Sequence, residues 1–84
     1  MAGMTYFVAL PFSAGEDGEL LAGEPQEAQS PSGAIARARA MAVRSGGAIA
    51  FARTGDPSLG DFEDAVVLGR YGAIPDDLAA YVRN

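Results

Sequence analysis

The sequence lacks histidine, cysteine, lysine and tryptophan. The first three supply most of the nucleophiles, neutral-pH bases, Schiff-base amines and zinc ligands that enzymes use. The serines consequently have no histidine or lysine to activate them. Gly46 and Gly47 likewise lack the lysine and the spacing of a phosphate-binding loop. These absences predict a protein that is not an enzyme and that binds no cofactor.

Long apolar runs are also missing. No segment approaches the roughly 20 apolar residues that span a bilayer, and the first residues carry no basic segment of a secretory signal. The absence of cysteine fits a reducing compartment. We therefore expect a cytoplasmic protein without a membrane partner. Met1 to Gly3 are compatible with residues added by cloning, with Met4 as the natural start.

Positive charge is scarce, because six arginines face eleven acidic residues and the net charge is −5. That balance disfavours duplex nucleic acid as a partner, since phosphate binding normally needs a basic surface. The acidic loop 56–64 departs from a calcium-binding loop, because Gly60 stands where an oxygen ligand is needed. We therefore expect no metal site. With 49% hydrophobic and 20% charged residues, positions 1–84 are typical of one small globular domain.

The first half of the chain predicts two strands. Residues 5–12 are rich in aromatic and branched side chains and predict a strand that is apolar on both faces. Pro11 lacks an amide donor, which predicts that regular pairing ends near it. After a glycine-rich turn, residues 19–29 predict an irregular edge strand that is broken around Gly23 and Pro25.

A helix is predicted over residues 31–45. Ser30 is a suitable N-cap, Pro31 suits the first helical position, and Gly46 supplies the stop. At about 100° per residue, small apolar side chains gather on one side of this helix. They are Ala34, Ile35, Ala38, Met41 and Ala42. Because alanine contributes little area, this side predicts a close contact with a sheet that is modest in energy.

Two more strands are predicted over residues 47–53 and 65–71, joined by a turn-rich connection with a β-turn at 56–59. Hairpin pairing is the simplest connection between them. A short helix could follow from Pro75, whose acidic neighbours favour a helix start. The expected fold class is α+β in the order ββαββ, with a four-stranded antiparallel or mixed sheet and one main helix on one face.

The second face of this sheet also needs a cover, because one alanine-rich helix covers only one face. A symmetric dimer is the commonest way to bury such a surface. The alternative within one chain is the segment 74–82, with Ile74, Leu78 and Tyr81 or Val82 as its packing side. We expect a homodimer and leave this alternative open.

Charge is segregated along the chain. Its middle, residues 31–53, contains four arginines and no acid, whereas the segments on either side contain acids and no base. Arg37 and Arg44 point away from the apolar side of the helix, and Arg39 lies at the boundary. One interpretation is that these three arginines form a surface for an anionic ligand or partner. The other is that they are solvated or pair weakly with the chain's own acids.

The chain resembles small stand-alone bacterial proteins over the stretches SPSGAIARARAMA and AIAFARTGDPSLGDFEDAVVLGRYGAIP. This resemblance implies a self-contained domain and brings no catalytic or binding residues with it. Together these observations predict a non-enzymatic interaction or accessory domain that self-associates and has an unidentified protein partner. The alternative is a binding module that uses Arg37 and Arg44 for an anionic ligand or acidic partner.

Overall fold

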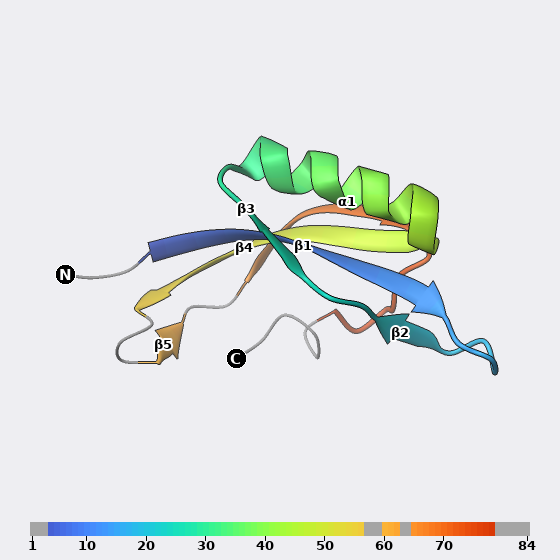
Figure 1. The fold of residues 1–84 in the computed structure, drawn as a ribbon. Coiled ribbons are helices and arrows are strands. Elements are labelled where there is room, and N and C mark those ends of the chain that lie inside the picture. Colours follow the sequence, from blue (N-terminus) through green and yellow to red (C-terminus); the bar gives the residue numbers. More distant parts are fainter. Residues whose placement is uncertain (1–3, 57–59, 63–64, 79–84) are drawn as a thin grey trace.

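Two long strands form the middle of the sheet (Figure 1). The computed structural model describes residues 4–56, 60–62 and 65–78. In it, β1 (Met4–Ala14) pairs antiparallel with β4 (Gly47–Asp56) over nine residue pairs. Both strands carry apolar residues on both faces, as expected of central strands that are covered on two sides.

Short strands border this central pair on both sides. β2 (Leu20–Ala22) and β3 (Gln26–Ala28) pair with β1, whereas β5 (Asp61–Phe62) and β6 (Val66–Gly72) pair with β4, all antiparallel. The sheet thus has four positions, and each outer position is divided between two strands. α1 (Pro31–Ser45) lies across one face (Figure 1). The predicted α+β fold with one main helix is therefore confirmed, and the sheet is antiparallel.

Pairing of β1 with β4 ends at Phe12, one residue past Pro11 and so near it as predicted, whereas β1 itself continues and pairs with β2 over residues 12–14. The N–H and C=O of a strand residue point to the same side, and the Pro11 carbonyl accepts a hydrogen bond from the Gly23 N–H at 2.9 Å. The missing donor of Pro11 therefore faces the gap between β2 and β3, where pairing is already interrupted. That interruption surrounds Gly23 and Pro25, as the sequence predicted.

Both ends of α1 follow the predicted signals. The Ser30 side-chain oxygen accepts a hydrogen bond from the Gly33 N–H at 3.0 Å, and Pro31 opens the helix. At the other end Gly46 has a positive φ of 109°, and its N–H donates to the Ala42 carbonyl. Because these signals are local, the helix begins and ends where the sequence predicts.

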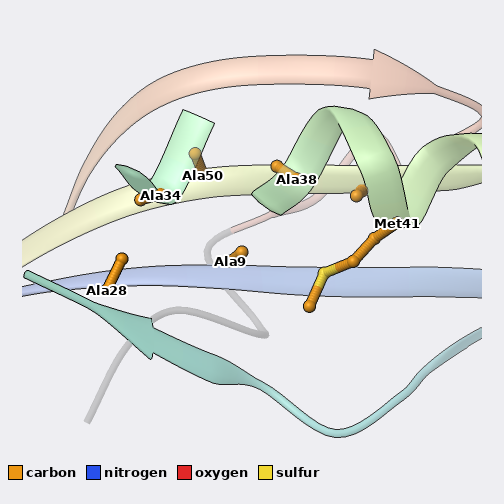
Figure 2. Close-up of a cluster of buried hydrophobic side chains, with 7 residues drawn as sticks. Ala9, Ala28, Ala34, Ala38, Met41 and Ala50 are labelled. Atoms are coloured by element: carbon orange, nitrogen blue, oxygen red, sulfur yellow. The ribbon is translucent and has the colours of Figure 1, made fainter. Parts of the chain in front are cut away.

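The helix-side core consists mainly of alanine. Figure 2 shows Ala34, Ala38 and Met41 of α1 facing Ala9 of β1 and Ala50 of β4. Ala34 and Ala38 are fully buried, as the spacing of small residues in the helix predicts. Small side chains allow the helix to approach the sheet closely, and the larger Met41 and the partly buried Ile35 add apolar volume from α1.

The other face of the sheet carries the larger side chains. Its buried cluster consists of Leu10, Phe12, Ile49, Phe51 and Leu78. The first four are strand residues, whereas Leu78 belongs to the segment after β6, which turns to the side of the sheet away from α1 (Figure 1). Ile74 packs against the same cluster. Residues 73–78 thus cover part of the second face within one chain.

Some sequence predictions fall on residues outside the described part. Met1 to Gly3 lie outside it, as does the β-turn at 56–59 apart from Asp56, which ends β4. The possible helix from Pro75 is described only over 75–78, which form a bend and a turn and no helix. Its remainder, 79–84, includes Tyr81 and Val82 and lies outside the described residues.

Candidate functional site

The side of α1 that faces away from the sheet is exposed along its length. Packing of Ala34, Ala38 and Met41 against the sheet turns the opposite side outward. Val43 on this side is 87% exposed, the largest value among the exposed large apolar side chains of the described residues. We call this outward side the α1 surface. Its members are Ala36, Arg37, Arg39, Ala40, Val43 and Arg44.

The α1 surface has an apolar centre and cationic flanks. At about 100° per residue, Ala36, Ala40 and Val43 fall on one line along the helix. Arg37 and Arg44 lie on one flank of that line, two turns apart, or about 10.5 Å along the helix axis. Arg39 lies on the other flank. The sequence predicted that Arg37 and Arg44 point outward and that Arg39 lies at the boundary, and the structure exposes all three.

The three arginines have little to bind within their own chain. Arg37 donates a hydrogen bond to the side-chain oxygen of Gln26 at 3.3 Å, which is a contact with an uncharged group. Within residues 4–56, 60–62 and 65–78, no ion pair joins Arg37, Arg39 or Arg44 to a carboxylate. The described acids of the flanking segments therefore do not neutralise the α1 surface.

Gln26 is a neighbour of Arg37 that sequence reasoning missed. It lies in the edge strand β3, which places it beside the first turns of α1. Its amide oxygen holds one guanidinium nitrogen of Arg37 and leaves the charge uncompensated. Only the close packing of β3 and α1 brings the two residues together, so no local sequence pattern could have indicated the contact.

The two arginines outside the helix that belong to the described residues have different surroundings. Arg53 is half-buried on the face of the sheet away from α1, beside Phe51 and Glu27. Arg70 is exposed on β6 and lines a cavity with Asp76 and Asp77. Sequence reasoning did not place Arg70 in a site, because this cavity forms only when the chain folds back after β6.

In the part of the chain that the structure describes, no group of three or more carboxylate, histidine or cysteine side chains is placed to hold a metal ion. The acidic loop 56–64 belongs only partly to the described residues, since residues 57–59, 63 and 64 lie outside them. No described helix is long and apolar enough to cross a membrane.

Comparison with known proteins adds no second source of information on the site. No protein-family model, no curated protein and no solved structure matches this chain. The exposed side chains of the α1 surface and their contacts are therefore what supports a function for the protein.

Proposed function

We propose that this protein is a non-enzymatic interaction domain whose α1 surface binds an acidic protein segment. The observation that carries the proposal is the exposure of Arg37, Arg39 and Arg44, none of which pairs with a carboxylate of the described residues. In a chain of net charge −5, cations concentrated on one helix face form a local region of opposite sign. Guanidinium groups bind carboxylates through paired hydrogen bonds.

A protein segment fits this surface better than a small anion does. Arg37 and Arg44 are separated by about 10.5 Å along the axis, and Arg39 lies on the opposite flank. The three therefore do not converge on one phosphate or carboxylate. Between them Val43 is almost fully exposed and offers an apolar contact to a partner. An amphipathic helix with small apolar residues flanked by acids would contact both the arginines and Val43.

A second copy of the chain is a poorer partner for the same surface. Two copies joined through their α1 surfaces would place six arginines together, and like charges across an interface oppose association. The predicted homodimer would therefore need another surface. The second sheet face, from which that prediction came, is partly covered by Ile74 and Leu78. The homodimer stays a prediction, and the acidic segment is the occupant that we propose for α1.

The absence of histidine, lysine and cysteine supports the non-enzymatic part of the proposal. The cytoplasm remains the expected compartment, because a chain without cysteine gains no disulfide in an oxidising one.

Binding to a designed peptide tests the proposal. The probe is a fluorescein-labelled 15-residue helical peptide with an alanine and leucine face flanked by glutamates, and its control has every glutamate replaced by glutamine. Fluorescence anisotropy should show binding of the acidic peptide that weakens as salt increases. The double variant Arg37→Gln/Arg44→Gln should weaken binding about tenfold, because two ion pairs are lost.

Arg70→Gln is the matched control for the single change Arg37→Gln, since each removes one positive charge and Arg70 lies on β6, away from α1. It should leave peptide binding close to that of the wild type. Equal weakening by Arg70→Gln and by a single Arg37→Gln change would indicate a general charge effect and contradict a specific surface. Equal binding of the glutamate and glutamine peptides would also refute the proposal.

A further inference from the structure

A cavity of about 620 Å³ lies on the side of the sheet away from α1. Val67 of β6 and Ile74 and Leu78 of the segment after it supply its apolar lining. All three side chains belong to, or pack against, the second-face cluster, so they are held in place by the core. The volume is in the range of pockets that bind small molecules.

Charges of both signs surround this apolar lining. Arg70 lines the cavity from β6, and Asp76 and Asp77 line it from the segment after Pro75. All three side chains are exposed, so they stand at the rim and not beneath the surface. Within the described residues, Arg70 makes no ion pair with either carboxylate. The guanidinium and the two carboxylates therefore share one cavity without neutralising one another directly.

A β-bulge brings Arg70 and Val67 to the same face. In a regular strand, residues three apart point to opposite faces. In β6 the register shifts, so that Val67 lies opposite Phe51 and Arg70 lies opposite Ile49. Phe51 and Ile49 both belong to the second-face cluster, whereas the extra residue, Leu68, packs toward α1. The bulge thus places a cation beside an aliphatic surface on one face of the sheet.

We propose that this cavity binds a small zwitterion with an aliphatic body, such as a free aliphatic amino acid or a short apolar peptide. Arg70 receives the carboxylate of the ligand, and Asp76 and Asp77 receive its ammonium group. The aliphatic body lies on Val67, Ile74 and Leu78. Since two carboxylates face one guanidinium, the ammonium end is held more strongly than the carboxylate end.

This site is separate from the α1 surface and does not rest on the function proposed for it. A metal ion fits the same cavity poorly, because Arg70 would repel it and two carboxylates supply few ligands. A purely apolar ligand would gain nothing from the three charged groups at the rim, which would stay solvated in the complex. A ligand with both an ammonium and a carboxylate group uses all three.

Titration followed by NMR tests the proposal, with ¹⁵N-labelled protein and four probes: leucine, leucylleucine, leucinamide and N-acetylleucine. Leucine or leucylleucine should give saturable shifts at roughly 1–10 mM, confined to amides near Val67–Arg70 and Ile74–Leu78. Whichever of leucine and leucylleucine binds with the lower Kd shows whether the cavity prefers a free amino acid or a short peptide. Leucinamide should bind about threefold to tenfold more weakly than leucine, and N-acetylleucine more weakly still.

Two variants assign the ends of the ligand. Arg70→Gln should weaken the binding of leucine about threefold to tenfold and leave the binding of leucinamide unchanged, since leucinamide has no carboxylate. The double variant Asp76→Asn/Asp77→Asn should weaken the binding of both compounds. Arg39→Gln on α1 is the charge-matched control and should change neither affinity. All substituted side chains are exposed, so the amide spectrum should confirm an intact fold for each.

The proposal is overturned by any of three results. The first is no saturable shift with leucine or leucylleucine up to roughly 10 mM. The second is binding of N-acetylleucine as tight as that of leucine. The third is an unchanged leucine affinity in the Arg70→Gln variant. None of these results bears on peptide binding by α1, so the two proposals fail or stand separately.

Discussion

The backbone carbonyl of Ala73 lies so close to Gly47 that no side chain could be added there. A Cβ atom at Gly47 would overlap this carbonyl. Next to it, the Ala73 N–H donates to the Gly46 carbonyl at 3.0 Å. The end of β6 is thereby joined to the junction between α1 and β4. From this junction the chain crosses to the second face of the sheet, where Ile74 and Leu78 pack.

Gly47→Ala should therefore strongly destabilise the protein. The new methyl group meets backbone atoms of Ala73, which cannot rotate away as a side chain could. We expect a loss of about 3 kcal/mol or more in the free energy of unfolding, measured in urea. Gly18→Ala is the control, because its positive φ of 84° adds strain but nothing lies within 4 Å. It should cost about 1–2 kcal/mol. Equal costs would show that Gly47 and Ala73 have room to separate.

Ala38→Leu should overpack the contact between α1 and the sheet. Ala38 is fully buried against the helix-side cluster, so three extra carbon atoms have no space. We expect a loss of about 1–3 kcal/mol in denaturant melts. Ala40→Leu adds the same atoms on the exposed side of α1 and should change stability by less than about 0.5 kcal/mol. If both variants melt like the wild type, the assignment of the buried side of α1 is wrong.

Ser30→Ala should remove the N-cap of α1. The Ser30 oxygen is the acceptor for the Gly33 N–H at 3.0 Å, and alanine offers no replacement. The expected cost is about 1 kcal/mol, read from thermal or urea unfolding. Ser32→Ala, at the second position of α1, removes only the 3.3 Å contact between the Ser32 and Ser30 hydroxyls and should change stability by less than about 0.5 kcal/mol. A larger loss for Ser32→Ala than for Ser30→Ala would contradict this role of Ser30.

Leu78→Ala should weaken the cover of the second sheet face. Leu78 is 8% exposed and packs in the cluster with Phe12 and Ile49. We expect a loss of about 2–3 kcal/mol, because a buried leucine side chain is removed. Truncation after Gly72 removes Ile74 as well and should cause aggregation, visible as a larger species by light scattering. If the truncated protein has the same size by light scattering as the full chain, the segment after Gly72 is not needed to cover the second sheet face.

The oligomeric state distinguishes the two covers that the sequence allows for the second face. A homodimer predicts a mass of about twice 8.6 kDa in size-exclusion chromatography with light scattering. A mass of 8.6 kDa at high micromolar concentration would contradict the homodimer and leave the segment after β6 as the cover.

Local sequence signals determined the helix and the course of the main strands. Ser30, Pro31 and Gly46 set the ends of α1 because a cap, a proline and a left-handed glycine act on the nearest backbone groups. The helical period likewise determined which side of α1 is buried and therefore where Arg37 and Arg44 point. The division of the edge strand followed from Gly23 and Pro25, whose effects on pairing are also local.

Only the tertiary structure decided how distant segments meet. Whether Pro11 interrupts pairing depends on which neighbouring strand its missing donor faces. Here it faces the gap between β2 and β3, where β1 has no paired residue to lose. The bulge in β6 depends on the register with β4, and it alone puts Arg70 beside Val67. Asp76 and Asp77 line the same cavity as Arg70 only because the chain turns back after β6 and Leu78 is held in the second-face core. Contacts of this kind depend on register and packing between segments far apart in the chain, which local spacing of residues does not encode.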